Sequence, residues 1–190
     1  MISETDIFHA RILIVDDQPV NVELLEYLLT STGYQAVSST TDPYQVAALH
    51  AAHHYDLIIL DMQMPGLNGF EVMEQLRPLE QGAWLPVLVV TAQPDHKVQA
   101  LEAGARDFLS KLIDPVEVLT RIRNMLEVRL LHRQARDYNA RLEATVRERT
   151  AELQRFRSAM DATADAIFLL DAVTAELLDV NDGACRMLAY

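Results

Sequence analysis

The stretch DLIILDMQMPG, residues 56–66, decides the fold of this chain. Its four apolar residues, 57–60, are typical of a short strand that is buried on both faces. Asp61 follows them directly, and Pro65-Gly66 then predicts a turn. A carboxylate at the end of a buried strand is costly unless a cation or hydrogen-bond donors pair with it. Other parts of the sequence must therefore supply partners for Asp61.

Short apolar runs of the same kind recur along the first 110 residues. They are 11–15, 34–39, 86–90 and 107–110. Amphipathic stretches separate them, and helices are predicted at 19–32, 68–77 and 95–103. Gly33 and Gly104 follow two of these helices, as C-cap glycines do, and Asp42-Pro43 is typical of a helix start. Five strands that alternate with helices predict an α/β fold with a parallel sheet.

Polar residues lie at the carboxyl ends of four of these predicted strands. They are Asp16, Asp17, Asp61, Thr91 and Lys111. In an open α/β sheet the carboxyl ends of parallel strands meet at one edge, where ligands bind. A single aspartate at a strand end is more often a cap or a turn former. Five such residues at one edge instead indicate a functional site.

The residue types at this edge suit phosphoryl chemistry. Neighbouring carboxylates repel one another, and their pKa values rise unless a cation joins them. Oxygen ligands with open positions suit Mg²⁺, and an aspartate can act as a nucleophile that forms an aspartyl phosphate. Mg²⁺, the Thr91 hydroxyl and the Lys111 ammonium could each contact one phosphoryl oxygen. That is the charge neutralisation that phosphoryl transfer requires.

Residues 11–127 resemble the receiver domain of two-component response regulators. The matching motifs, in order, are ILIVDDQPVN, LIILDMQMPGLNGFEVM, VLVVTAQ, AGARDFLSK and DPVEVLTRIRNML. The resemblance implies a flavodoxin-like, doubly wound sheet of five parallel strands in the order 2-1-3-4-5. It also implies a signalling switch rather than an enzyme.

The same resemblance assigns roles at the predicted site. Asp61 would accept a phosphoryl group from a sensor histidine kinase or a phosphotransfer protein. Mg²⁺ would be held by Asp17, Asp61 and the backbone carbonyl of Gln63, and Asp16 would reach the ion through water. Thr91 and the ring of Phe108 would form the switch pair, in which the hydroxyl moves inward on phosphorylation and the ring follows. The surface of the fourth helix, fifth strand and fifth helix would then change.

The sequence departs from the family pattern after the fifth strand. Receivers usually have Lys-Pro there, often with a cis bond, whereas this chain has Lys111-Leu112. A cis bond before a residue other than proline costs roughly 2.5–4 kcal/mol. We therefore expect a trans bond or backbone strain, and either could shift the Lys111 ammonium.

One long helix is predicted from Pro115 to about Met160, because no further proline or glycine interrupts this stretch. An apolar seam runs along it and is interrupted by Arg149. Its members are Leu131, Ala135, Tyr138, Leu142, Val146, Leu153, Phe156 and Met160. The four-residue step from Leu142 to Val146 is a stutter, which locally unwinds a coiled coil. The seam predicts a parallel homodimer; the alternative is an amphipathic helix that packs on its own receiver.

The last residues, 158–190, resemble the opening of a PAS domain, with the strands AIFLLD and ELLDVN and the start of a helix. A full domain needs roughly a hundred residues, so we expect a fragment of a longer protein. The predicted domains are a receiver at 1–127, a coiled-coil signalling helix at 128–157 and an incomplete PAS domain at 158–190. Receivers joined in this way often precede cyclic-di-GMP-turnover or histidine kinase modules, which makes these the predicted output.

The charge of the chain is unevenly distributed. The net charge is −11 over 1–127, +4 over 128–157 and −5 over 158–190. The acidic segments argue against nucleic acid as a partner, and the arginines of the middle segment are spread around the helix as solvated flanks. The single cysteine, Cys185, cannot form an internal disulfide, and neither a signal peptide nor a membrane span is predicted. We expect a cytoplasmic protein without membrane contact.

Two other functions are alternatives to a phosphorylation switch at Asp61. A phosphatase of the haloacid dehalogenase type is also α/β and uses an aspartate nucleophile with Mg²⁺. It requires a general acid two residues after the nucleophile, and Gln63 cannot supply a proton. The second alternative is a receiver that is not phosphorylated and serves as a dimerisation platform. Leu112, in place of the usual proline, is the feature that favours this alternative.

Overall fold

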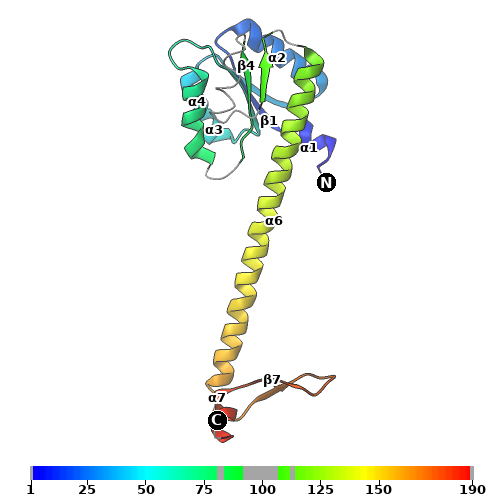
Figure 1. Ribbon diagram of the computed structural model, residues 1–190, viewed down its shortest axis with the longest axis vertical. Helices are drawn as coiled ribbons and strands as arrows, with labels where there is room; N and C mark the ends of the chain where they lie inside the picture. Colours follow the sequence, from blue (N-terminus) through cyan, green and yellow to red (C-terminus); the bar gives the residue numbers. More distant parts are fainter. Residues whose placement is uncertain (1, 81–83, 92–106, 112–113, 189–190) are drawn as a thin grey trace. The chain divides into compact units, whose positions relative to one another are not determined.

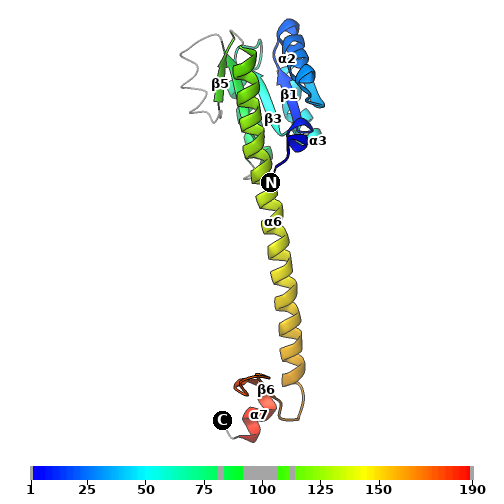
Figure 2. The same ribbon diagram turned by 90° about the vertical axis from the view of Figure 1, so that its right-hand side faces the viewer.

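The computed structural model describes residues 2–80, 84–91, 107–111 and 114–188 (Figures 1 and 2). The chain divides into two compact units, Met1–Ala135 and Arg136–Tyr190. Helix α6 (Pro115–Asp161) runs through the limit between them. The predicted helix at 95–103, Gly104 and the Lys111-Leu112 bond lie outside the described residues.

The first unit contains a parallel sheet with the order β2-β1-β3-β4-β5, as predicted. Its strands are β1 (Arg11–Val15), β2 (Ala36–Thr40), β3 (Leu57–Asp61), β4 (Val87–Thr91) and β5 (Asp107–Ser110). The register places Leu13 of β1 beside Ser38 of β2 on one side and Ile58 of β3 on the other. The strand order makes β3 the central strand, and Asp61 is its last residue.

Helices cover both faces of this sheet, with α2 and α6 on one side and α3 and α4 on the other (Figure 1). The helices and turns are α1 (Glu4–Phe8), α2 (Pro19–Thr32), η1 (Pro43–Gln45), α3 (Val46–His53), α4 (Gly69–Leu76) and η2 (Arg77–Glu80). Gly33 ends α2 in the left-handed conformation, with φ of 110°. Asp42 caps η1 through the Tyr44 N–H, with Pro43 in the first position, as predicted.

Successive residues of the buried strands alternate between two hydrophobic clusters. Ile12 and Ile59 belong to the cluster under α2 and α6, whereas Leu13 and Ile58 belong to the cluster under α3 and α4. Both faces of β1 and β3 are therefore apolar, which explains why these strands appear in the sequence as continuous apolar runs.

The prediction for the second strand was wrong at its start, because β2 begins at Ala36 and not at residue 34. The Tyr34 N–H bonds to the Leu29 carbonyl at 3.2 Å and so closes the end of α2 instead of pairing in the sheet. The Tyr34 ring is buried and meets Phe8 edge to face, with ring centroids 5.3 Å apart. Phe8 ends α1, a helix that the sequence analysis did not predict; a capping box of Ser3 and Asp6 starts it.

Helix α6 confirms the predicted long helix. Its first part packs on the sheet through Val118, Ile122, Leu126 and Leu130. The large apolar seam residues from Leu131 to Phe156 are exposed, with exposed fractions from 46% for Leu142 to 69% for Leu153. The prediction was wrong for the last seam residue, Met160, which is 9% exposed and is buried in the second unit. Within the described parts of the chain, no helix combines the length and apolar character that crossing a bilayer requires.

The second unit contains the end of α6, the antiparallel strands β6 (Phe168–Leu170) and β7 (Leu177–Val180), and helix α7 (Asp182–Met187). Asn181 is fully buried and organises it. Its side-chain oxygen caps α7 through the Ala184 N–H at 2.9 Å, and its amide donates to the Met160 carbonyl at 2.8 Å. One buried side chain thus ties the hairpin and α7 to the end of α6.

Candidate functional site

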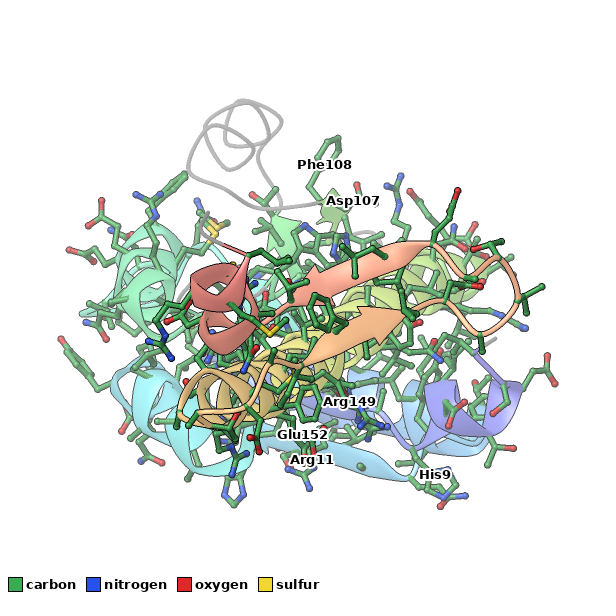
Figure 3. The ribbon with its side chains drawn as sticks, turned by 90° about the horizontal axis from the view of Figure 1, so that it is seen from below. His9, Arg11, Asp107, Phe108, Arg149 and Glu152 are labelled. Atoms are coloured by element: carbon green, nitrogen blue, oxygen red, sulfur yellow. The ribbon has the colours of Figure 1, made fainter. Side chains whose placement is uncertain are left out.

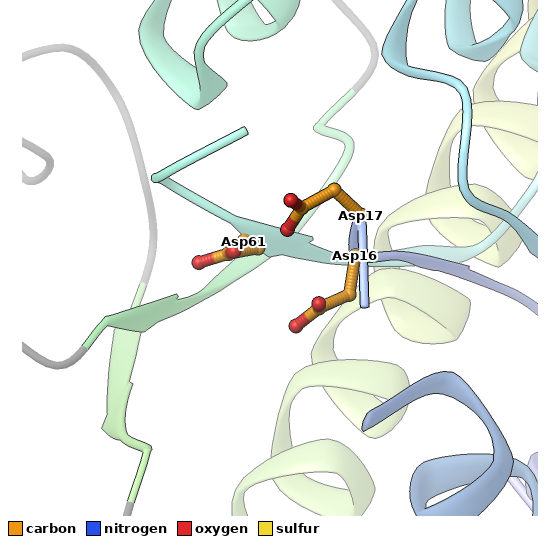
Figure 4. A group of neighbouring side chains, drawn as sticks. All are labelled: Asp16, Asp17 and Asp61. Carbon is orange, nitrogen blue, oxygen red and sulfur yellow. The ribbon is translucent and has the colours of Figure 1, made fainter. Parts of the chain in front are cut away.

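The five predicted site residues lie at one edge of the sheet. Asp16 and Asp17 follow β1, Asp61 ends β3, Thr91 ends β4, and Lys111 follows β5. Figure 4 shows the side chains of Asp16, Asp17 and Asp61 gathered at this edge. Because β3 lies between β1 and β4, the sheet order itself brings these residues together.

Asp61 is the most enclosed carboxylate of this group, with 1% of the residue exposed. Its Oδ2 accepts a hydrogen bond from the Lys111 ammonium at 2.8 Å, and its Oδ1 accepts one from the Gln63 N–H at 3.3 Å. Burial raises the pKa of Asp61 above the ordinary aspartate value, although Lys111 and the Gln63 N–H act in the opposite direction. Lys111, 50 residues downstream, thus supplies the partner that the buried carboxylate of Asp61 requires.

Asp16 and Asp17 complete an acidic cluster with Asp61. One carboxylate oxygen of each residue lies within 4.8 Å of the corresponding oxygens of the other two. Asp16 is buried, and the Gln18 N–H holds its Oδ1 at 2.9 Å, whereas Asp17 is partly exposed. Three converging carboxylates, one of them open to solvent, form a donor set that fits Mg²⁺.

Lys111 is the cation that the structure places in this cluster. Its Nζ lies 2.8 Å from Asp61 Oδ2 and 3.7 Å from Asp16 Oδ2. Burial acts to lower the pKa of Lys111, but the hydrogen bond to Asp61 and the nearby negative charges outweigh it, so the pKa is raised. The Lys111 N–H also bonds to the Thr91 carbonyl at 3.0 Å, which ties the end of β5 to the end of β4.

Thr91 and Phe108, the predicted switch pair, lie on the neighbouring strands β4 and β5. Thr91 is buried, and Phe108 pairs in register with Val89, two residues before Thr91. Phe108 is partly buried against the cluster under α3 and α4, and the Arg121 guanidinium lies 6.0 Å from its ring centroid. Figure 3 shows the Phe108 ring projecting outward from the edge strand.

Two residues that shape the site were not singled out from the sequence. The Asn21 amide donates to both carboxylate oxygens of Asp16 at 3.0 Å. A Cβ on Gly69 would lie 2.8 Å from the Asp61 carbonyl oxygen and 2.7 Å from Met62 Sδ, so α4 approaches β3 this closely because residue 69 is glycine. Asn21 lies five residues after Asp16 in the first turn of α2, a signal that the spacing carries.

Comparison with known families agrees with this geometry. Residues 12–123, more than half of the chain, match the family model for the response regulator receiver domain. The chain belongs to the response regulator receiver family. Receivers act in two-component signalling through phosphorylation of an aspartate, and this general function applies to the chain. Residues 154–190 match a PAS domain model, which confirms the predicted resemblance of the last segment.

Two relatives align with nearly the whole of this chain. The response regulator PleD of Caulobacter vibrioides is 35% identical over 175 residues, which are 91% of this chain and 35% of PleD. The alginate biosynthesis transcriptional regulatory protein AlgB of Pseudomonas aeruginosa is 34% identical over 177 residues, 90% of this chain and 37% of AlgB. The chain therefore spans little more than a third of the length of these relatives.

Two solved structures support the flavodoxin-like fold. The receiver domain of the sensor histidine kinase PA1611 from Pseudomonas aeruginosa PAO1, with a magnesium ion coordinated in its active site cleft, is 30% identical with a TM-score of 0.57. A putative response regulator from Chloroflexus aurantiacus J-10-fl is 32% identical with a TM-score of 0.58. Each match covers 63% of this chain and 98% of the other.

Proposed function

We propose that Asp61 is the phosphoacceptor of this receiver and that a sensor histidine kinase or a phosphotransfer protein is its donor. The observation that carries the proposal is the Lys111 ammonium at 2.8 Å from Asp61, beside the carboxylates of Asp16 and Asp17. A buried aspartate with a lysine partner and two further acids at a sheet edge is the arrangement that an aspartyl phosphate requires.

The chain's own residues supply most of the chemistry. A carboxylate oxygen of Asp61 attacks the phosphorus of the donor's phosphohistidine; the oxygen–phosphorus bond forms as the nitrogen–phosphorus bond breaks. The Lys111 ammonium then leaves its contact with the carboxylate for a phosphoryl oxygen, and the Thr91 hydroxyl donates to another. Burial of Asp61 strengthens both contacts, because fewer water molecules compete for them.

Magnesium is the proposed cofactor of the reaction. Asp16, Asp17, Asp61 and the backbone carbonyl of Gln63 would hold it. When bound, Mg²⁺ would supply positive charge against the transferred phosphoryl group. The donor set on this chain supports the assignment, because three carboxylates with oxygens within 4.8 Å carry more negative charge than the Lys111 ammonium beside them offsets.

The test is direct phosphorylation of the chain. The protein is incubated with Mg²⁺ and acetyl phosphate, and its peptides are searched by mass spectrometry for a phosphoryl group. We expect the label on the peptide that contains Asp61, its loss in Asp61→Asn, and its retention in Asp42→Asn, which changes a partly exposed aspartate that caps η1. Unchanged labelling in Asp61→Asn would contradict the proposal.

Output is proposed to pass through Thr91, Phe108 and then α6. The contacts of Arg121 on α6 support this route, because its guanidinium lies 6.0 Å from the Phe108 ring centroid and also bonds to Asp107 and Glu117. The proposed domains are the receiver at 1–127, the signalling helix at 128–157 and the partial PAS domain at 158–190. The proposed output is cyclic-di-GMP turnover or a kinase in a part of the protein that this chain does not contain.

A parallel homodimer through α6 is the proposed assembly. The large seam residues from Leu131 to Phe156 are exposed in the single chain, so a second copy can cover them. In a parallel pair, heptad geometry places Glu152 of one copy beside Arg157 of the other, which complements their charges. A receiver that only dimerises is the alternative function, and the exposed seam is the observation that favours it. If acetyl phosphate does not phosphorylate Asp61, this alternative is supported.

A further inference from the structure

A second buried carboxylate lies at the opposite end of β3 from Asp61. Asp56 directly precedes the strand and is 3% exposed. Its Oδ2 accepts the Arg11 N–H at 3.1 Å, and its Oδ1 accepts a hydrogen bond from Arg133 Nη1 at 2.7 Å. The Arg129 Nε lies 3.9 Å from the same Oδ1. A buried carboxylate depends strongly on such partners, so Asp56 attaches α6 to the base of the sheet.

A second set of contacts holds the same turn of α6. Arg129 Nη1 donates to the Trp84 carbonyl at 2.7 Å. The Trp84 indole stacks on His132, with ring centroids 5.4 Å apart and an interplanar angle of 30°. Trp84 lies shortly before β4. We name Asp56, Trp84, Arg129, His132 and Arg133 the base clamp.

The strands that meet the base clamp are the strands that carry the phosphoacceptor site. β1 begins at Arg11, β3 begins directly after Asp56, and β4 begins three residues after Trp84. At their other ends these strands carry the site residues Asp16, Asp17, Asp61 and Thr91. Each strand has five residues, about 17 Å at 3.3 Å per residue. Buried, densely packed strands of this length move as rigid elements, so a displacement at the site reaches the clamp.

We propose that the base clamp transmits the phosphorylation state of Asp61 to the part of α6 that leaves the receiver, with Asp56 and Arg133 as its positioning residues. The proposal rests on the proposed function, because it requires that Asp61 is phosphorylated. The clamp residues of α6 lie just before Ala135, the limit of the first unit. They therefore form the last turns of α6 that the sheet holds, where a small strand displacement changes how the helix is anchored.

The variant that tests the clamp is Arg133→Gln. The Arg133 side chain is 55% exposed, and Asp56 keeps the Arg11 N–H and the nearby Arg129, so the variant is expected to fold. Arg123→Gln is the matched control, since Arg123 is on the same helix and forms an ion pair of the same 2.7 Å length with Glu4, outside the clamp. Arg133→Lys keeps the charge and serves as the rescue.

The measurement uses the full chain with Mg²⁺, in the presence and absence of acetyl phosphate. Hydrogen exchange is followed on peptides that cover residues 129–135, and phosphorylation of Asp61 is quantified in the same samples by intact mass. We expect phosphorylation to change exchange in the native chain, Arg123→Gln and Arg133→Lys by about twofold or more, because opening of a local segment responds to its anchoring contacts. Arg133→Gln is expected to be phosphorylated equally, to exchange about fivefold faster without phosphate, and to show no further change.

The outcomes separate the two proposals. If Asp61 is phosphorylated in every variant and Arg133→Gln responds like the native chain, the clamp does not transmit, while the proposed function stands. The same conclusion follows if the phosphorylated native chain shows no change at residues 129–135, or if Arg133→Lys is as unresponsive as Arg133→Gln. If the native chain takes no phosphoryl group on Asp61, the proposed function fails, and the transmission role fails with it.

Discussion

At Asp61, burial and the Lys111 ammonium act on one carboxylate in opposite directions, and burial has the larger effect, so the pKa is raised. The folded protein therefore binds a proton at Asp61 more tightly than the unfolded chain does. Ionisation of Asp61 lowers the stability of the fold at pH values above the folded-state pKa, and this loss is absent below the unfolded-state pKa. A cation bound beside Asp61 would offset the charge of the carboxylate and so reduce this loss of stability.

The raised pKa of Asp61 can be measured directly. In the metal-free protein, carbon-13 NMR of the aspartate carboxyls is expected to show Asp61 titrating at higher pH than an aspartate in a short unstructured peptide. Added Mg²⁺ is expected to move this titration to lower pH, because a cation favours the carboxylate. A titration of Asp61 at or below the peptide value without metal would contradict the account of burial given above.

Asn21 is a positioning residue for the acidic cluster. Its amide donates to both oxygens of Asp16 and so sets the orientation of that carboxylate. We expect Asn21→Ala to weaken Mg²⁺ binding by roughly tenfold, because partners that orient a ligand typically contribute 10- to 100-fold in affinity. Calorimetric titration with Mg²⁺ measures this. Asn139→Ala, at an exposed position of α6, is the control and is expected to bind as the native chain does.

At the scale of elements, the approach of α4 to β3 depends on one glycine. A Cβ on Gly69 would meet the Asp61 carbonyl oxygen at 2.8 Å, which is backbone and cannot move aside cheaply. We expect Gly69→Ala to lower the free energy of unfolding by about 1–3 kcal/mol, as overpacking does. Urea unfolding measures the change. Gln75→Ala, on the exposed face of α4, is expected to stay within about 0.5 kcal/mol; equal effects of both changes would rule out the close approach as the cause.

The elements differ in how far the sequence predicts them, and the reason is physical. β1, β5 and α2 have the bounds expected from the sequence. The continuous burial of residues 12–15 in β1 and the Gly33 cap of α2 are features that leave local signals. Tyr34 is apolar and β-prone, yet it closes α2 and packs on Phe8, a contact between residues 26 apart in the chain. The base clamp is harder still, since Asp56 meets Arg133 across 77 residues and no local pattern marks the pair.

The candidate site also has features that local sequence signals predict and others that they do not. Residue types at strand ends predicted where Asp16, Asp17, Asp61, Thr91 and Lys111 come together, because parallel strands bring their carboxyl ends to one edge. The partners of those residues were not predicted. The five-residue spacing of Asn21 from Asp16 is a local signal, whereas the opposing effects of burial and Lys111 on the Asp61 pKa depend on distances that only the packed fold sets.

For the whole molecule, the exposed seam of α6 predicts association. Leu153 is 69% exposed in the single chain and occupies a seam position. A dimer would bury two copies of it, each contributing about 1.5–3 kcal/mol, so Leu153→Asp is expected to raise the dissociation constant at least about a hundredfold. Sedimentation velocity over a concentration series measures this. Gln154→Asp, one position away and off the seam, is expected to leave association close to native; a monomeric native chain at high concentration would contradict the dimer.

Arg149 sets the strength of the same seam. It occupies a seam position, and its Nη1 bonds to Glu152 Oε2 at 3.0 Å within the same helix (Figure 3). A parallel pair brings two such guanidiniums together at the core of the coiled coil, and a polar residue there lowers stability while fixing the register. Arg149→Leu is therefore expected to tighten the dimer, with a dissociation constant lower by at least tenfold in the same sedimentation series. Arg147→Leu, an exposed arginine off the seam that pairs with Glu143, controls for the loss of charge. Weaker association of Arg149→Leu would mean that Arg149 makes favourable contacts across the interface, which a parallel, in-register pair with two facing arginines does not provide.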